Sequence, residues 1–325
     1  MTTPRRTFLR LAAAAAALPI LPRTAGAQSY PTRPVRIVVG YPPGGPTDIF
    51  ARLMGQWLSD HMGQPFVIEN RPGAGSTIGV QSVVNSPADG YTLILISTSA
   101  VISGHYYKSL NFNLTRDIVP VCGIALEPLV MVVNPQVAAK TVPEFIADAK
   151  QKPGKYVMAS VGNGTTPHMA GALFMMMAGV KMAHVPYRGG GPALLDLLSG
   201  QVQVLFATAP GIADYVRSGK LRALGVTGTM RLKELPDVPS VSDFVPGYES
   251  SQWYGISAPR DTPAEIIEKL NGDINAALAD PQMRAHLSDL SGTPLPGTPA
   301  DFGKLIAEET EKWGRVIKFA NIKPE

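Results

Sequence analysis

Hydrophobic and polar positions alternate along the chain in blocks that predict strands and helices in turn. Residues 35–39 form a short, mostly β-branched run in which Arg36 is the one polar position. This pattern is typical of a strand that is covered on both faces. An amphipathic helix is predicted to follow, with an apolar face that contains Phe50, Leu53, Trp57, Leu58 and His61.

The same alternation continues to the end of the chain. Short apolar runs predict further strands at residues 66–69, 91–96, 129–133, 156–160, 183–187, 202–207, 223–227 and 253–258. Amphipathic segments predict helices at residues 77–85, 142–150, 166–179, 192–199, 211–218, 263–279, 281–288 and 300–319. Strands that alternate with helices through short loops indicate an α/β fold with a mostly parallel sheet.

The order of the elements predicts two lobes. The alternation pauses after the third strand, begins afresh midway along the chain, and ends in helices that return to the first unit. We therefore expect a first lobe of residues 28–128 plus 252–325 and a second lobe of residues 129–251. The crossings near residues 127–130 and 251–253 would form a hinge, with a ligand cleft between the lobes. A single large sheet is the alternative.

The excess positive charge of the chain lies at its N-terminus. The formal net charge is +4, but residues 1–27 contain four arginines and no acidic residue. The rest of the chain carries 25 basic and 25 acidic side chains. Composition therefore gives no reason to expect a nucleic-acid partner.

The first residues resemble an export signal. Residues 5–10, RRTFLR, form a twin-arginine pattern, and an alanine-rich apolar run follows as far as Leu21. This run is shorter than the roughly 18–20 residues that cross a bilayer. The small residues before Gln28 predict cleavage after Ala27 and a periplasmic location. An N-terminal anchor or an ordinary cytosolic helix is the alternative.

Residue types that support metal or thiol chemistry are few or poorly spaced. The single cysteine, Cys122, excludes an intramolecular disulfide and a cysteine-based zinc cluster. Its apolar neighbours predict a buried small side chain rather than a reactive thiol. The five histidines lack metal-ligand spacing, and the three methionines at 175–177 are interpreted as core packing. We expect neither a metal nor a cofactor.

Small-residue junctions between strands and helices predict an anion site. Ligands of parallel α/β sheets bind at the carboxyl ends of strands, where helix N-termini offer free N–H groups and a positive dipole end. Glycines let a ligand approach this backbone closely. Four glycine-rich junctions and one hydroxyl-rich junction fall at such places: residues 41–48, 71–77, 161–166, 187–192 and 97–100. Any one of them could simply cap a helix, but their number favours a shared site.

Known nucleotide and enzyme motifs are missing from these junctions. No loop has the Lys-Ser/Thr pair of a phosphate-binding loop, and Ile78 stands where a dinucleotide fingerprint needs its third glycine. The sequence also lacks the G-x-S-x-G, H-E-x-x-H and S-x-x-K patterns. A small carboxylate is therefore favoured as the ligand. A hydrolase that uses Ser76 or Ser99 with His168 is a weaker alternative.

Two side chains near these loops have open interpretations. His168 lies near a predicted helix N-terminus, where it could donate to a carboxylate or pack as a neutral ring beside the loop. Arg188 could pair with a carboxylate through two hydrogen bonds or lie on the surface.

Four sequence blocks together resemble the Bug family, the periplasmic solute receptors of tripartite tricarboxylate transporters. They are YPPGGPTD from Tyr41, ENRPGAGSTIG from Glu69, ADGYTL from Ala88 and HVPYRGGGPALLDLLSGQV from His184. The resemblance covers nearly all of the mature chain. It implies a two-lobed, type II periplasmic-binding-protein fold in which each lobe is a mostly parallel sheet flanked by helices.

The same resemblance implies which residues meet the ligand. Asp48 would cap or brace the first binding loop. The ligand-binding positions would be Tyr41, Gly44, Gly45, Thr47, Ser76, Thr77, Thr98, Ser99, Asn163, Gly164, Thr165, Thr166, His168, Arg188, Gly189, Gly190, Ala207 and Thr208.

The function that the resemblance implies is transport rather than catalysis. The receptor would be a monomer that captures a small carboxylate and delivers it to the membrane permease subunits. Di- and tricarboxylates, acidic amino acids, nicotinate and aromatic acids all stay open as ligands. A sensory receptor that presents the bound ligand to a membrane kinase would have the same fold and site, so it stays open as well.

Overall fold

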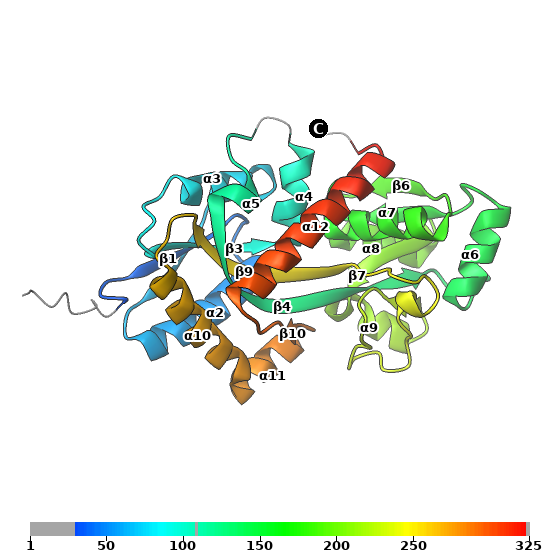
Figure 1. The fold of residues 1–325 in the computed structure, drawn as a ribbon. Helices are drawn as coiled ribbons and strands as arrows, with labels where there is room; N and C mark the ends of the chain where they lie inside the picture. The colour runs from blue at the N-terminus through cyan, green and yellow to red at the C-terminus, as the bar shows by residue number, and fades with distance from the viewer. Residues whose placement is uncertain (1–29, 108–109, 323–325) are drawn as a thin grey trace, which may run out of the picture.

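The computed structural model describes residues 30–107 and 110–322, and the predicted export signal lies outside them. Within these residues the strands form one curled, mixed sheet of ten strands with helices packed around it (Figure 1). The strands are β1 (Val35–Val39), β2 (Phe66–Asn70), β3 (Thr92–Ser97), β4 (Ile118–Val133), β5 (Val157–Ser160), β6 (Ala183–Pro186), β7 (Val204–Thr208), β8 (Arg222–Val226), β9 (Ser251–Pro259) and β10 (Thr293–Pro294).

The helices follow the predicted segments closely. They are α2 (Pro46–Met62), α3 (Thr77–Val84), α4 (Thr98–Tyr106), α5 (Leu114–Asp117), α6 (Val142–Gln151), α7 (Thr166–Ala178), α8 (Gly190–Ser199), α9 (Ala209–Arg217), α10 (Ala264–Ala279), α11 (Pro281–Asp289) and α12 (Pro299–Phe319). The predictions had no counterpart for α4 and α5. No helix in the described part of the chain is long and apolar enough to cross a membrane.

The strand order is β2-β1-β3-β9-β4-β7-β5-β6, with β8 and β10 also paired to β4. The outer pairs are parallel: β1 with β2 and β3, and β5 with β6 and β7. The central pairs, β3 with β9, β9 with β4 and β4 with β7, are antiparallel. Each part of the sheet thus keeps a parallel set of strands, while the strands that join the two parts run antiparallel.

Strand β4 is much longer than the strand predicted at residues 129–133. Its first part, residues 118–128, pairs with β9, and its last part pairs with β7 and β8. The first part contains Pro120 and Gly123, residue types that are depleted in strands. The pairing absorbs them through register shifts next to both residues. The strand was missed because its sequence breaks the usual pattern.

The buried face of α2 differs from the predicted one. Phe50 and Leu58 are buried as expected, but His61 is exposed and stacks on Trp57 with ring centroids 3.7 Å apart. Met54 and the carboxylate of Asp48 are buried instead. The expectation failed because apolar spacing cannot anticipate a charged residue on the inward face.

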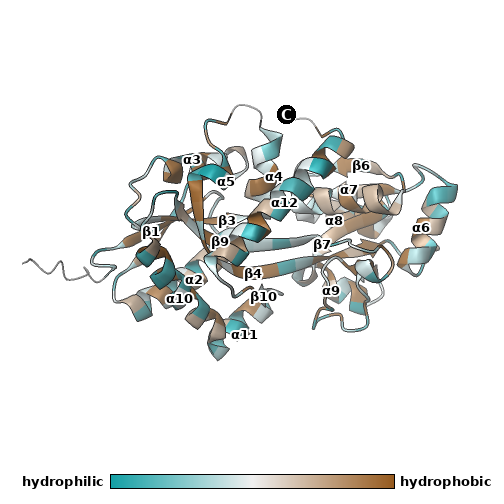
Figure 2. Cartoon of the chain, viewed as in Figure 1, coloured by the Kyte–Doolittle hydropathy of each residue, from teal (hydrophilic) through white to brown (hydrophobic). Residues whose placement is uncertain are grey.

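The core lies on both faces of the sheet, and hydrophilic positions gather on the outer faces of α10, α11 and α12 (Figure 2). Cys122 is fully buried in this core, as predicted. Burial raises the pKa of its thiol to about 11, and a hydrogen bond with the Gly297 backbone opposes this shift in part. The thiol is therefore protonated and unreactive near neutral pH.

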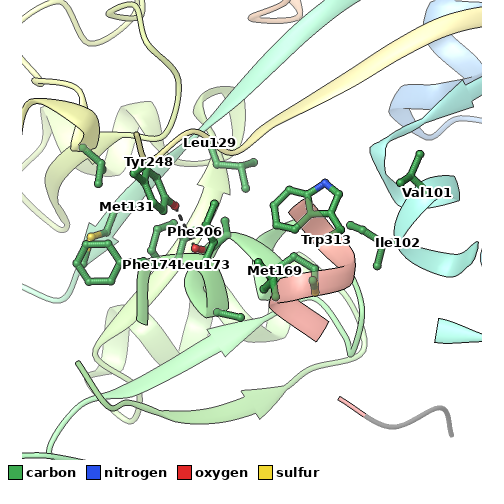
Figure 3. Packing of buried hydrophobic residues seen from close by; sticks show 14 of the residues in the cluster. Val101, Ile102, Leu129, Met131, Met169, Leu173, Phe174, Phe206, Tyr248 and Trp313 are labelled. Carbon is green, nitrogen blue, oxygen red and sulfur yellow. Dashed lines mark hydrogen bonds between the residues drawn. The ribbon is translucent and has the colours of Figure 1, made fainter. Parts of the chain in front are cut away.

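Helix α12 packs across both parts of the sheet and contacts α4 on one side and α7 on the other. Its Trp313 is fully buried and lies beside Met169 of α7 (Figure 3). The indole N–H groups of Trp313 and Trp253 both donate to one carboxylate oxygen of Glu309, at 2.7 and 3.2 Å. Lys312 pairs with this same carboxylate and with Glu249. This buried cluster joins α12 to β9 and to the segment that precedes it.

Trp313→Phe tests how much this cluster stabilises the fold. The variant loses an indole donor to the buried Glu309 carboxylate and leaves a small void. We expect a loss of about 2 kcal/mol in unfolding free energy, measured by urea denaturation. Phe319→Ala, at a 54% exposed position of the same helix, should change it by less than about 0.5 kcal/mol. Equal stability of Trp313→Phe and the unmodified protein would contradict this account.

Candidate ligand-binding cleft

A cleft of about 670 Å³ opens between the two parts of the sheet. One side is formed by the loop from β1 to α2, the start of α4 and the start of β9. It is lined by Tyr41, Pro42, Pro43, Gly45, Pro46, Thr47, Ser99 and Gln252. The other side is formed by strand ends and helix starts of the second part. It is lined by Leu129, Val161, Thr165, Thr166, Pro167, Gly190, Gly191, Leu194, Leu205, Phe206, Ala207, Thr208, Gly211 and Ile212.

In the described structure, five helices begin at this cleft: α2, α4, α7, α8 and α9. None of their N-cap side chains accepts a hydrogen bond from its helix; the N-cap residues are Gly45, Ser97, Thr165, Gly189 and Thr208. The Thr165 hydroxyl instead donates to the carbonyl of Gly162 at 2.7 Å.

Most helices that begin elsewhere are capped. The side chains of Asn113, Thr141, Asp280 and Thr298 cap α5, α6, α11 and α12, whereas α3 and α10 lack such a cap. Free N–H groups at helix starts, together with the positive end of each helix dipole, attract anions. The helix N-termini that lack a side-chain cap, and that therefore suit a negatively charged group, thus lie mainly at the cleft.

The buried side chain of Asp48 braces the loop from β1 to α2. Its carboxylate accepts hydrogen bonds from the backbone N–H of Gly44 at 2.9 Å, from Arg52 at 2.8 and 3.0 Å and from Asn70 at 2.8 Å. Asn70 also donates to the carbonyl of Tyr41 at 3.0 Å. Burial alone would raise the pKa of Asp48, but these hydrogen bonds outweigh it and hold the pKa at about 2. The Asp48 carboxylate is therefore charged, and these hydrogen bonds occupy both of its oxygens.

Hydroxyl groups face one another where the two sides meet. Ser99 Oγ lies 3.4 Å from Thr166 Oγ1, a contact between α4 and α7. The Tyr41 hydroxyl is buried and has no hydrogen-bond partner among the residues that the structure describes. Burial raises its pKa to about 12, although the neighbouring Ser99 and Ser97 hydroxyls oppose the shift, so it keeps its proton and can donate to a ligand.

Half of the predicted ligand-binding positions line the cleft. They are Tyr41, Gly45, Thr47, Ser99, Thr165, Thr166, Gly190, Ala207 and Thr208. The other predicted positions are not among the lining residues: Gly44, Ser76, Thr77, Thr98, Asn163, Gly164, His168, Arg188 and Gly189.

Several of these outer residues shape the loops. Thr98 Oγ1 accepts from the backbone N–H of Trp253 at 2.9 Å, and Thr77 Oγ1 donates to the carbonyl of Ala74 at 2.9 Å. Ser76 is 1% exposed, and a Cβ on Gly40 would lie 1.9 Å from its Oγ. This close approach requires glycine at position 40. Arg188 is exposed and is not among the lining residues.

His168 packs beneath the second-lobe loop. Its Nδ1 accepts from the backbone N–H of Gly164 at 3.1 Å, and its ring stacks on His184 with centroids 3.7 Å apart. Burial, and then the neighbouring His184, lower the pKa of His168 to about 3. Burial lowers the pKa of His184 to about 4. Both rings are neutral at pH 7, which fits a packing role.

The lining residues that sequence analysis missed are mostly apolar. Leu129, Leu205 and Phe206 are at most 2% exposed, Val161 follows β5 and Leu194 lies on α8. They resemble core residues in the sequence, because an apolar residue has the same pattern whether it faces a core or a cleft. The described residues contain no group of three or more histidine, cysteine, aspartate or glutamate side chains placed to hold a metal ion.

A chain of hydrogen bonds connects the buried carboxyl group of Glu127 to a residue that lines the cleft. Glu127 is 4% exposed and accepts from the Tyr254 hydroxyl at 2.8 Å. The Gln252 amide donates in turn to that hydroxyl, and Gln252 lines the cleft. Burial raises the pKa of Glu127 to about 7, although the bond from Tyr254 opposes the shift.

A family model described as the tripartite tricarboxylate transporter family receptor matches residues 50–322 of this chain. The chain belongs to this receptor family. BugT from Bordetella pertussis is 36% identical over 295 residues, which cover 90% of this receptor and 90% of BugT.

Two solved structures agree with this assignment. Rpa4515 from R. palustris with adipate is 34% identical, covers 91% of this receptor and 100% of that chain, and superposes with a TM-score of 0.75. MatC from Rhodopseudomonas palustris with bound malate is 30% identical, covers 89% of this receptor and 100% of that chain, and has a TM-score of 0.71.

These matches confirm the α/β, two-lobed fold and the family resemblance. The family and its solved members are solute-binding receptors rather than enzymes. The hydrolase alternative is therefore wrong, and the contacts agree: the Ser99 hydroxyl faces Thr166, while Nδ1 of His168 is occupied by the Gly164 N–H.

Glu127→Gln tests the buried carboxylate through the pH dependence of stability. The folded-state pKa of about 7 lies above the ordinary value of 4.5, so Glu127 contributes stability that is complete below about 4.5 and is lost as the pH rises through 7. We expect the variant to gain on the order of 3 kcal/mol relative to the unmodified protein between pH 5 and pH 8, measured by urea denaturation.

Glu311→Gln is the matched control, because the Glu311 side chain is 74% exposed. Its stability difference from the unmodified protein should not change over this pH range. A pH-independent difference for Glu127→Gln as well would contradict the raised pKa.

Proposed function

We propose that this receptor captures a small carboxylate in the cleft between its lobes and delivers it to the membrane permease of a tripartite tricarboxylate transporter. The observation that carries the proposal is the set of uncapped helix starts at the cleft. Adipate and malate in the two solved relatives support a carboxylate as the ligand class.

The N-terminus of α2 is the strongest candidate for the first carboxylate contact. Gly45 precedes the helix with φ −81° and ψ 167°, and a Cβ at this position would meet nothing closer than the carbonyl of Pro42 at 3.9 Å. The open space beside Gly45 therefore lies next to free backbone donors. The hydroxyls of Tyr41, Thr47, Ser99 and Thr166 supply further donors around it.

Ligand capture is proposed to involve closure of the two lobes. The lobes would comprise residues 28–128 plus 252–325 and residues 129–251, joined where β4 and β9 cross. Few backbone segments would then have to bend, because the chain would pass between the two lobes only along the paired strands β4 and β9. Ser99 and Thr166, on opposite sides, are placed to share a ligand oxygen.

The receptor is proposed to act as a periplasmic monomer. The twin-arginine pattern in residues 5–10 and the small residues before Gln28 support export and cleavage after Ala27. A soluble receptor released in this way would reach the permease by diffusion.

Gly45→Asp tests whether an anion binds at the start of α2. The new carboxylate can cap the helix, so we expect the melting temperature to stay the same or rise slightly. It also occupies the donors and repels a ligand anion. Affinity for the tightest-binding acid of a carboxylate panel should fall tenfold or more, about 1.4 kcal/mol, by isothermal titration calorimetry.

Gly45→Ala is the matched control, because it adds the Cβ without a charge or a cap. It should keep the affinity within about threefold. Equal affinity of Gly45→Asp and Gly45→Ala would place the carboxylate elsewhere. A flat response of the unmodified protein to every acid would refute the proposed function itself.

A further inference from the structure

Three polar side chains, Glu127, Tyr254 and Gln252, form a network of hydrogen bonds that begins in the core and ends at the cleft. Gln252 lines the cleft, and its amide N–H donates to the Tyr254 hydroxyl. That hydroxyl donates in turn to the Glu127 carboxylate at 2.8 Å. Glu127 is 4% exposed, and Tyr254 is fully buried. Because Glu127 stands opposite Gln252 in the pairing of β4 with β9, the network lies next to the proposed boundary between the lobes.

The direction of the hydrogen bonds in this network depends on one proton. An ionised carboxylate only accepts hydrogen bonds, and a tyrosine hydroxyl has a single proton to donate. While Glu127 is ionised, Tyr254 donates to it, and Gln252 can meet the hydroxyl only as a donor. Once Glu127 is protonated, its own O–H can donate to the Tyr254 oxygen. Tyr254 is then free to donate to the amide oxygen of Gln252.

The two directions leave different atoms of Gln252 available to a ligand. With Glu127 ionised, the amide nitrogen is held by Tyr254, and the amide oxygen is the group left for the cleft. With Glu127 protonated, Tyr254 holds the oxygen, and the NH₂ group turns to the cleft. A ligand carboxylate accepts hydrogen bonds and donates none. It therefore favours the network in which Glu127 is protonated.

The surroundings of Glu127 allow its charge to respond to the cleft. Burial raises its pKa to about 7, and Tyr254 is the titratable neighbour whose hydrogen bond opposes that shift. Tyr41 faces Tyr254 and keeps its proton. In the described part of the chain, no lysine or arginine pairs with Glu127.

The charged side chains on the other elements that pack against β4, and on α2, are exposed or bonded elsewhere. The bonded ones are Asp48 with Arg52, Arg116 with Asp117, Asp214 with Arg217, Lys269 with Asp273, Glu309 with Lys312, and Arg222 with the carbonyls of Val137 and Ala139.

We infer that Gln252 is a further ligand contact, that Glu127 positions its amide through Tyr254, and that capture of a carboxylate takes up a proton at Glu127. The proton comes from solvent and adds to the Glu127 carboxylate, while the other changes are exchanges of hydrogen bonds. This inference rests on the proposed function and adds a regulation of the same site. The receptor binds its ligand more tightly at lower pH and releases it more readily at higher pH.

The pH dependence of affinity tests the inference. Malate, adipate, citrate, glutamate and nicotinate are first titrated into the purified protein by isothermal calorimetry, and the tightest-binding acid is then titrated at pH 6 and pH 8. If this acid binds about tenfold tighter to the protein with Glu127 protonated, a free-protein pKa of about 7 makes affinity fall about fivefold between these two pH values. Titrations at pH 7.5 in buffers of different ionisation enthalpy should show uptake of about half a proton per ligand beyond the ligand's own ionisation.

Two variants separate the network from other titrating groups. Glu127→Gln cannot ionise, and its amide can donate to Tyr254, so it should bind as tightly at pH 8 as at pH 6 and take up no such proton. Gln252→Leu keeps the Glu127 carboxylate but removes the end of the network at the cleft. It should bind more weakly at pH 6 and lose the fivefold fall.

Glu234→Gln is the matched control. Glu234 is a half-buried carboxylate that accepts from the Ser291 hydroxyl at 3.0 Å and is not among the lining residues. This variant should keep the fivefold fall in affinity.

Each contrary result is distinct. An equal fall in Glu127→Gln and in the unmodified protein would overturn the inference and leave the proposed function standing, because the acid still binds. A fall that persists in Gln252→Leu would assign the effect to charge repulsion and remove the role of Gln252. If no acid of the panel binds, the proposed function fails and the inference with it. The proton uptake of the unmodified protein decides the question even if a variant does not fold.

Discussion

Strand β4 is hydrogen-bonded to β9 along residues 118–128 and to β7 and β8 along residues 129–133, so one strand belongs to both parts of the sheet. Buried backbone groups must be paired, and this continuous pairing fixes where each parallel set of strands begins. The ends of β1 and β3 on one side then face those of β5 and β7 on the other. The helices that follow these strands start around a common space, and α12 packs across both sides.

The cleft is built at a cost to helix stability. A side-chain N-cap typically contributes about 1 kcal/mol, yet α2, α4, α7, α8 and α9 all lack one where they meet the cleft. The fold retains stability elsewhere, through capped helices and through the two tryptophans that share Glu309. Backbone N–H groups that lack a cap at the cleft can bind an anion, whereas capped N–H groups away from the cleft stabilise their helices.

Sequence reasoning located most elements, because apolar runs such as residues 35–39 and glycine-rich junctions have direct physical causes. It missed the first part of β4, where Pro120 and Gly123 hide a strand that only its pairing with β9 stabilises. At the cleft, the junctions predicted at residues 41–48 and 161–166 both contribute lining residues. Sequence reasoning did not find Leu205 or Phe206, because both are buried strand residues whose place beneath a cleft depends on where the other lobe lies. For His168, whose sequence position allowed two roles, the structure shows a ring packed under the loop.

The proposed carboxylate site rests on the uncapped helix starts that surround one cleft. A crystal structure of the receptor with its tightest-binding acid tests that account most directly. The carboxylate oxygens should lie about 2.7–3.2 Å from backbone N–H groups at the start of α2, with Ser99 and Thr166 on either side. A carboxylate held instead by Arg188 or another surface cation, outside the cleft, would contradict it.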